Sequence, residues 1–440
     1  MFCMRRGFRG SKPSERGFAS VSKFVNVVMG LKGVTFSFEE LAAVGVKRIS
    51  VGRAFTRAAV NNGGLMADQQ YTKRLLSADS HVMEPRDLWE KRIDAKWHDK
   101  APRIEMLDES GDYIVIDGMR PRPLAFEGPM ADLKAQGMEI PVPKGYRYEQ
   151  NRPGSWDPNE RLKDQDLDGV SGEVIYPGVG LHIVRAPDAE YLYACCRAYN
   201  DWLAEYCSVH PARLKGAALL PNRGPIEWAV SEAERAAKMG LVTAMLPSFM
   251  DDRAYNLPEW DRLWAALQDM NIVVSMHLCG REPYGIAHGP GAGGINVGVI
   301  KFGMYDTVMR LIWGGAPMRF PKLKWSMVEG GIGWIASVVQ FMDHWWDDHR
   351  GWMEPKLPET PSYYFHRQFF ATFEDDRAGV LTRDMIGVEN LMWGSDYPHT
   401  EGVWPYSRKK VAQNFANIPE GDTRKMVHDN VARVFGFPMN

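Results

Sequence analysis

The chain has 440 residues, of which 45% are hydrophobic and 25% are charged, a composition typical of globular proteins. Its 53 basic and 55 acidic side chains nearly cancel, and no long basic run is present, which argues against a nucleic acid as partner. No apolar run is long enough to span a membrane, and the five cysteines lack CxxC spacing, so we expect a cytoplasmic protein with reduced, mostly buried thiols.

Residues 1–70 do not share the pattern of the remainder, and we interpret them as an N-terminal extension or fused remnant without a functional role. Residues 21–60, with "NVVMG" and "GVKRISVG", resemble the C-terminal part of the isocitrate lyase/phosphoenolpyruvate mutase family. In that family these segments would be two late barrel strands joined by a helix, and the catalytic residues lie earlier in the chain. We therefore expect no site here, and we expect Met66 to be the native start.

From residue 71 onward, short apolar runs alternate with amphipathic helical stretches such as 188–210 and 258–270. The runs that predict strands are 74–79, 172–177, 215–221, 242–247, 271–277, 323–329, 368–374 and 390–396. This alternation indicates a parallel sheet. Eight such units over this length predict an α/β fold, a (β/α)8 TIM barrel, in residues 71–440.

Two insertions interrupt the alternation. The first covers roughly 98–160 and follows the first strand, and the second covers 279–303 and follows the fifth. Because both follow strand ends, they are expected at the face of the barrel that carries active sites, as a lid or as walls for a substrate.

Side chains that can bind metal ions recur at the predicted strand ends. They are Asp79 and His81 on the first strand, His277 on the fifth, Glu329 on the sixth, Glu374 after the seventh, and Asp396 and His399 at and after the eighth. In an extended segment, residues i and i+2 face the same side, so Asp79 and His81 should lie together. Since all these strand ends share one rim of a barrel, the pattern predicts a metal site rather than separate structural residues.

Several motifs along the chain resemble the amidohydrolase superfamily, in its amidohydrolase-2 branch. They include "RLKDQDLDGVSGEVIYP", "WGSDYPHTE" and the closing "NVARVFGF", and the resemblance spans about residues 74–437. The branch includes aminocarboxymuconate-semialdehyde decarboxylase and the resorcylate and salicylate decarboxylases. The resemblance implies a divalent metal ion bound by Asp79, His81, His277 and Asp396. It also implies catalysis by Asp396, which handles protons, together with His277 and Glu329.

Two positions depart from the usual pattern of this superfamily. Asp79 replaces the first histidine of a His-x-His pair, and Glu329 stands where many relatives carry a histidine. Carboxylates make a site harder and more anionic, which favours manganese or iron over zinc. Glu329, His399 and Glu374 are candidates for an outer contact or for a second ion, so the site could hold one ion or two.

Other histidines and aromatic residues allow weaker predictions. His182, after the second strand, and His288, in the second insertion, are candidate substrate contacts. "FMDHWWDDH" (341–349) contains two His and three Asp but follows the sixth strand as a helix, so we expect an amphipathic helix and not a metal site. The 15 Trp and 24 Met fit an apolar or aromatic ligand pocket, although a large core is the simpler explanation.

Three functions are compatible with these residues. The first is a metal-dependent enzyme, either a decarboxylase or a hydrolase of a small carboxylated molecule, because both reactions use one ion and one Asp. The second is a non-haem diiron oxygenase on the same barrel, and the third is a non-catalytic binding protein. The acidic pair on the first strand favours the decarboxylase, and the resemblance also implies a homodimer.

Overall fold

The computed structural model describes residues 26–29, 48–51, 70–124, 145–250, 252–280 and 285–439. The chain divides into two units, Met1–Gln70 and Tyr71–Asn440. In the first unit, β1 (Asn26–Met29) and β2 (Arg48–Val51) pair in parallel, in agreement with the two strands expected there. The helix expected between these strands lies outside the described residues, and the origin of this unit stays a prediction.

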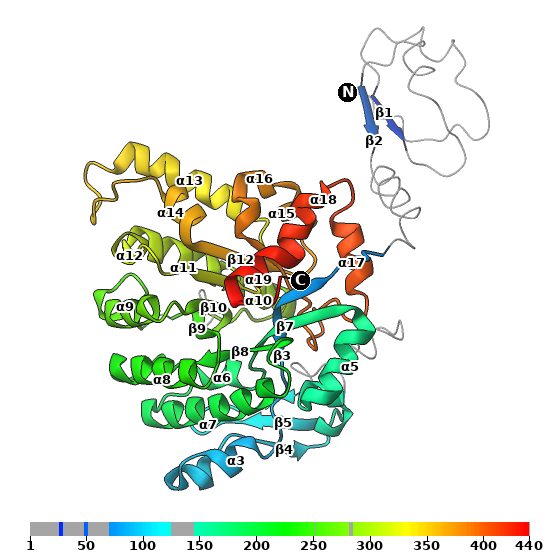
Figure 1. The fold of residues 1–440 in the computed structure, drawn as a ribbon, viewed down its shortest axis with the longest axis vertical. Coiled ribbons are helices and arrows are strands. Elements are labelled where there is room, and N and C mark those ends of the chain that lie inside the picture. Colours follow the sequence, from blue (N-terminus) through cyan, green and yellow to red (C-terminus); the bar gives the residue numbers. More distant parts are fainter. Residues whose placement is uncertain are drawn as a thin grey trace, which may run out of the picture. The chain divides into compact units, whose positions relative to one another are not determined.

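The second unit contains one sheet of eight parallel strands, visible as arrows in Figure 1. In sheet order they are β3 (Leu75–His81), β7 (Val170–Tyr176), β8 (Leu214–Leu219), β9 (Thr243–Phe249), β10 (Val273–Gly280), β11 (Trp325–Val328), β12 (Phe369–Phe373) and β13 (Leu391–Trp393). Each strand overlaps one of the eight apolar runs in the sequence. The predicted (β/α)8 barrel is therefore confirmed.

Contacts between the first strand and the residues after the last one close the barrel. The amide of Asp396 donates to the carbonyl of Asp79 (2.8 Å), and the amide of His81 donates to the carbonyl of Tyr397 (2.6 Å). Gly394 allows this approach, because a Cβ at that position would lie 2.6 Å from the Cβ of Asp79. The closure brings the predicted ligands of the first and eighth strands to the same place.

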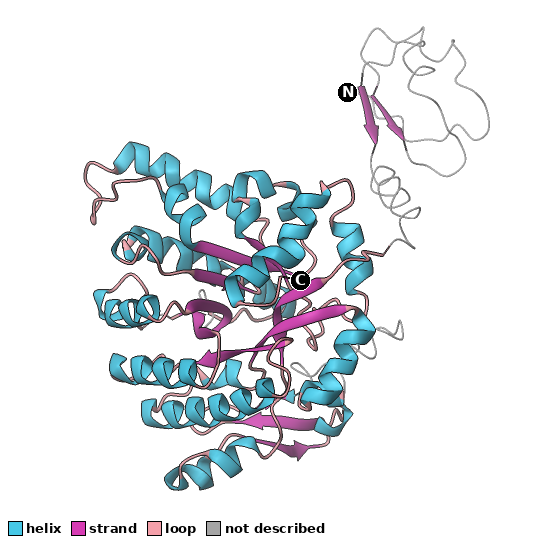
Figure 2. Cartoon of the chain, viewed as in Figure 1, coloured by secondary structure: helices cyan, strands magenta, loops and turns pink. Residues whose placement is uncertain are grey.

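Helices pack along the outside of the strands, as Figure 2 shows. They are α3 (Leu88–Arg92), α5 (Pro158–Asp168), α6 (Gly180–Ile183), α7 (Ala189–Ser208), α8 (Ile226–Lys238), α9 (Asp261–Asp269), α10 (Ala292–Ile300), α11 (Phe302–Trp313), α12 (Ala316–Arg319), α13 (Ile335–His349), α14 (Pro361–Gln368), α15 (Arg377–Leu381), α16 (Arg383–Ile386), α17 (Ser407–Asn414), α18 (Glu420–Arg424) and α19 (Asn430–Phe435). Local sequence fixes several of their ends. The Asp157 side chain accepts the amides of Asn159 and Glu160 at the start of α5, and Gly169, with φ 75°, ends that helix.

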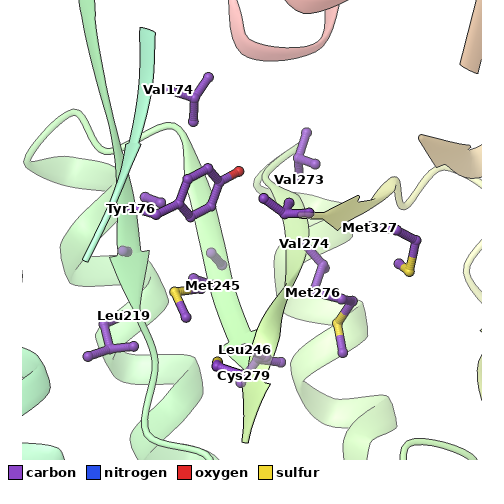
Figure 3. Close-up of a cluster of buried hydrophobic side chains, with 14 of the residues drawn as sticks. Val174, Tyr176, Leu219, Met245, Leu246, Val273, Val274, Met276, Cys279 and Met327 are labelled. Carbon is purple, nitrogen blue, oxygen red and sulfur yellow. The ribbon is translucent and has the colours of Figure 1, made fainter. Parts of the chain in front are cut away.

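The core consists of strand side chains and the helix faces that cover them. Figure 3 shows part of it, with Val174 and Tyr176 of β7, Leu219 of β8, Met245 and Leu246 of β9, Val273, Val274, Met276 and Cys279 of β10, and Met327 of β11. Much of the tryptophan content is also core, since Trp89, Trp260, Trp264, Trp325 and Trp393 are almost fully buried. For these tryptophans the simpler explanation, a large core, is correct.

The two insertions have different structures. Within the first, β4 (Arg103–Asp108), β5 (Gly111–Val115) and β6 (Arg122–Pro123) form a small antiparallel sheet. The second contains α10, which is mostly apolar and has no buried residue. No helix among the described residues is long and apolar enough to cross a membrane.

Candidate metal centre

Asp79 and His81 stand at the carboxyl end of β3, and both side chains are fully buried. His81 Nε2 lies 3.5 Å from Asp79 Oδ1, so the two side chains face the same point, as their i, i+2 spacing predicts. This buried pair at the end of the first barrel strand is the first part of the candidate site.

His277 comes to this pair from β10, across the barrel. Its Nε2 lies 3.7 Å from Asp79 Oδ1, and its ring is edge-on to that of His81, with centroids 4.9 Å apart. Asp79, His81 and His277 each offer an atom to a group in which all these atoms lie within 4.8 Å of one another. Three side chains from two strands thus surround one small volume.

Asp396 and His399, which follow β13, complete the arrangement. Asp396 Oδ1 lies 3.5 Å from His81 Nε2 and 3.0 Å from His399 Nδ1, and the three residues form a second group of potential ligands. Asp396 has φ 54°, in the left-handed region that a non-glycine residue adopts at a cost. The chain therefore accepts local strain to turn this carboxylate toward His81.

The ligand atoms of this cluster lack other partners. Among the described residues, Asp79 Oδ1, His81 Nε2, His277 Nε2 and Asp396 Oδ2 are buried and make no hydrogen bond. Buried polar atoms are nearly always hydrogen-bonded, because leaving them unpaired costs free energy. Two imidazole nitrogens and two carboxylate oxygens are a donor set that suits a divalent transition-metal ion, so the residues present fit such an ion.

A backbone contact fixes the orientation of His81. Its Nδ1 lies 2.8 Å from the carbonyl oxygen of Pro177, which can only accept a hydrogen bond, so Nδ1 carries the proton. The lone pair is then on Nε2, which points into the cluster. This is the usual outer support of a metal-binding histidine.

The profile of the amidohydrolase family matches residues 149–437, about two thirds of the chain. The chain belongs to the amidohydrolase family. The resemblance predicted from the sequence motifs, and with it the enzyme class, is confirmed. The separate resemblance of residues 21–60 to another family stays a prediction.

Known proteins share this amidohydrolase barrel. The gamma-resorcylate decarboxylase of a Polaromonas strain is 26% identical over 259 residues, which cover 54% of this chain and 75% of that protein. An amidohydrolase of Mycobacterium avium subsp. paratuberculosis superposes with a TM-score of 0.67 at 22% identity and covers 83% of this chain and 100% of its own. A dihydroxybenzoic acid decarboxylase of Polaromonas, solved with manganese and the inhibitor 2-nitroresorcinol, has a TM-score of 0.55 at 18% identity, covering 83% and 97%. At these identities the two structures establish the fold.

Glu329 lies beside the cluster of potential metal ligands and belongs to neither ligand group. Its Oε2 is 3.5 Å from His277 Nδ1, and its side chain is 19% exposed. Its φ of 68° places a second strained non-glycine residue at the mouth of the barrel. The geometry fits an outer contact that orients His277, one of the two roles predicted for Glu329.

The pKa directions in the cluster show how densely it is charged. Burial raises the pKa of Glu329 well above its usual range, and the negative Asp396 and Asp79 raise it further. Burial and the same two neighbours raise the pKa of Glu374 to about 8, and burial also raises the pKa of Asp396 against the opposing effect of His399. A bound cation would relieve this repulsion, because it is the largest local charge wherever it binds.

Two members of the cluster are held in the protonation state that a metal ion needs. Burial disfavours the ionised carboxyl of Asp79, but the polar interactions with the nearby rings of His277 and His81 outweigh it and lower the pKa. Burial lowers the pKa of His81 to about 3, with help from His399, so His81 is neutral near pH 7. A carboxylate and a neutral imidazole are the forms that bind metals.

The remaining predicted residues are placed differently. Glu374, whose Oε1 is buried without a hydrogen bond among the described residues, belongs to neither ligand group. His182 is buried on α6, and His288 is exposed in the segment before α10. Neither histidine joins a ligand group, and a substrate contact by either one stays a prediction.

Sequence inspection overlooked a buried charged network behind the cluster. Arg161 donates from Nη1 to the carbonyl of His81 (2.7 Å) and from Nε to Glu173 (2.6 Å), while the Ser80 hydroxyl donates to the other oxygen of Glu173 (3.1 Å). These contacts fix the position of the carboxyl end of β3, which carries Asp79 and His81. The available signal was Glu173 itself, a charged residue inside the apolar run "GEVIYP".

Glu84 is another residue whose role became visible only in the structure. Its two carboxylate oxygens accept the amides of Val179 (2.7 Å) and Gly180 (3.0 Å), and the side chain is fully buried. The contact ties the loop after β3 to the start of α6. Nothing in the local pattern "HVMEP" predicted it, because the partner amides lie far along the chain.

Proposed function

We propose that this amidohydrolase is a metal-dependent decarboxylase of a small aromatic or apolar carboxylic acid. The observation that carries the proposal is a pair of ligand groups that share His81, in which four buried atoms make no hydrogen bond among the described residues. These atoms belong to Asp79, His81, His277 and Asp396. The similarity to a gamma-resorcylate decarboxylase over three quarters of that protein supports the reaction.

The four residues would hold one divalent ion, and manganese is the ion we expect. Two carboxylates beside two imidazoles suit manganese or iron better than zinc, and the similar dihydroxybenzoic acid decarboxylase holds manganese. When bound, the ion would supply positive charge that attracts and orients the negatively charged substrate. We assign His399 to proton exchange and Glu329 to an outer contact.

Asp396 is the residue that we assign to proton transfer. His399 Nδ1 lies 3.0 Å from Asp396 Oδ1, so the two residues can exchange the proton that Asp396 delivers. The proton passes to the substrate carbon that bears the carboxylate. The new carbon–hydrogen bond uses an electron pair of the ring. The carbon–carbon bond then breaks, its electron pair returns to the ring to restore aromaticity, and carbon dioxide leaves.

The alternatives use the same residues in other ways. A hydrolase would use Asp396 to take a proton from water, which the cluster also permits. The comparisons support the metal-dependent decarboxylase and give no support to the diiron oxygenase. A homodimer and a cytoplasmic location are parts of the proposal, and the four buried free thiols of Cys195, Cys196, Cys207 and Cys279 fit a reducing compartment.

A metal and product assay tests the proposal. The purified full chain is analysed for its metal content, loaded with Mn²⁺, and incubated with a panel of hydroxybenzoic acids while released carbon dioxide is measured. We expect one ion per chain, carbon dioxide from at least one acid, and none from Asp396→Asn at unchanged unfolding temperature. Two irons per chain with substrate-dependent oxygen uptake, or hydrolysis without carbon dioxide, would overturn the proposal.

A further inference from the structure

We infer that Thr372 is a positioning residue that sets which oxygen of Asp79 faces the metal ion and holds the backbone of Glu329 at the same time. The inference rests on the proposed function, since it takes Asp79 as a metal ligand. Thr372 lies on β12, and its side chain is fully buried. Its hydroxyl contacts Asp79 and the amide of Glu329, so its role is exerted through those residues.

The first contact determines the direction of the second. The amide of Glu329 donates to Thr372 Oγ1 at 2.8 Å, so the hydroxyl oxygen acts there as an acceptor. A hydroxyl carries a single proton, which is then available for another group. Thr372 Oγ1 donates that proton to Asp79 Oδ2 at 3.4 Å. One hydroxyl therefore connects residues of β3 and of the turn after β11.

Because of this connection, the two carboxylate oxygens of Asp79 have different surroundings. Oδ2 is engaged by the hydroxyl, while Oδ1 is unpartnered among the described residues and lies 3.5 Å from His81 Nε2 and 3.7 Å from His277 Nε2. Oδ1 is thus the oxygen that faces the ion, and Asp79 is restrained from rotating to offer both. Outer hydrogen bonds of this kind orient metal-binding carboxylates.

The same hydroxyl stabilises the strained turn that carries Glu329. Residue 329 has φ 68°, and such a conformation persists only when its surroundings fix it. Thr372 holds its amide, and Asp376, just beyond β12, accepts the amides of Ile332 and Gly333, both at 2.7 Å. Because Glu329 Oε2 lies 3.5 Å from His277 Nδ1, the position of this turn also bears on His277.

The experiment compares variants of Thr372 that differ in the hydroxyl group. Thr372→Val keeps the shape without the hydroxyl, and Thr372→Ser keeps the hydroxyl. Mn²⁺ affinity of the metal-free full chain is measured by calorimetry, and unfolding temperature is measured on the same samples. We expect Thr372→Val to bind Mn²⁺ about 10- to 100-fold more weakly, and Thr372→Ser to bind it nearly as the native chain does.

A control separates a positioning role from a general loss of stability. Thr243 of β9 is also buried and donates to the carbonyl of Val273 (2.8 Å), but it lies at the amino end of its strand, away from the ligands. Thr243→Val should lose stability and keep its Mn²⁺ affinity. Thr372→Ala, which leaves space instead of a methyl group, gives the affinity if the valine variant does not fold.

Asp79→Asn, measured alongside, keeps this inference distinct from the proposed function. If it loses Mn²⁺ binding while Thr372→Val binds as the native chain does, Thr372 has no positioning role and the metal site stands. If Thr372→Ser binds as weakly as Thr372→Val, the hydroxyl is not the cause and the inference also fails. If Asp79→Asn binds Mn²⁺ normally, the metal site itself is wrongly assigned.

Discussion

Helix α13 and the mouth of the barrel both bring a histidine within 3.5 Å of an aspartate. His344 Nε2 and Asp348 Oδ2 lie 3.5 Å apart on α13, the same separation as His81 Nε2 and Asp79 Oδ1, but the α13 side chains are 71% and 56% exposed and those of β3 are fully buried. On α13 water can hydrogen-bond to both groups, so the ion pair contributes little to the free energy of folding. At the mouth the pair is buried, and His277 of β10 and Asp396 after β13 lie beside it.

The comparison shows that residue types and spacing do not define a metal site. Burial without hydrogen-bond partners and convergence from separate strands distinguish the β3 cluster. Neither histidine of "FMDHWWDDH" belongs to a group of potential ligands among the described residues. The expectation of an amphipathic helix there agrees with α13, which buries Ile335, Val338 and Val339.

The largest effect should come from removing a ligand at the mouth. Asp79→Asn replaces a charged oxygen by an amide, and we expect Mn²⁺ affinity to fall by more than about 100-fold, beyond the loss of an outer contact, with turnover lost. Calorimetry of the metal-free chain measures the affinity. Asp348→Asn on α13 is the matched control, and an equal loss in both variants would remove the distinction between the two regions.

A smaller effect should appear in the pH dependence of stability. Burial raises the pKa of Glu84 to about 7, against the lowering effect of its backbone hydrogen bonds, whereas the same carboxyl has an ordinary value of 4.5. The folded chain therefore holds this proton more tightly, so the stabilisation is full below pH 4.5 and is lost as the pH rises through about 7.

Urea unfolding on either side of this window measures the effect. The native chain should lose about 1–3 kcal/mol from this group between pH 5 and pH 8, and Glu84→Gln should reduce that loss. Asp348→Asn should leave the loss unchanged, because its carboxyl is largely exposed. An identical pH profile for the native chain and Glu84→Gln would show that Glu84 is not the titrating group.

The smallest effect belongs to α13 itself. Replacing both His344 and His349 by alanine should change the free energy of unfolding by no more than about 0.5 kcal/mol and leave the Mn²⁺ content unchanged. Elemental analysis of the purified variant checks the second point. A loss of metal in this variant would mean that the exposed residues of α13 bind ions, and would contradict the distinction between α13 and the barrel mouth.

The sequence predicted the barrel and the rim well, for a local reason. Apolar runs mark the strands, and polar residues that end those runs must lie at one end of a parallel barrel. The shared position of Asp79, His81, His277 and Asp396 could therefore be predicted without a structure. The same argument includes Glu374, which belongs to neither ligand group, since position in a run does not fix where a side chain points.

What the sequence could not reveal depends on contacts between distant parts of the chain. Thr372 of β12 contacts Asp79 of β3 and Glu329 after β11, which are far from it in sequence. The amides that Glu84 accepts belong to the start of α6, which also lies far along the chain from the local pattern around Glu84. The left-handed backbone of Glu329 has no signature in residue type. The substrate contact expected of His288, which is exposed before α10, stays a prediction.

The closure between the first and last strands also determines when during folding the candidate site can form. Ser77 and Ser395, 318 residues apart in sequence, have hydroxyl oxygens 3.3 Å apart, and Asp396, the next residue, belongs to one of the two groups of potential ligands. A nascent chain that has not yet made β13 has only the Asp79, His81 and His277 part of the centre. Contacts of such long sequence separation form late in folding. The proposed metal site would therefore be complete only after β13 has joined the barrel.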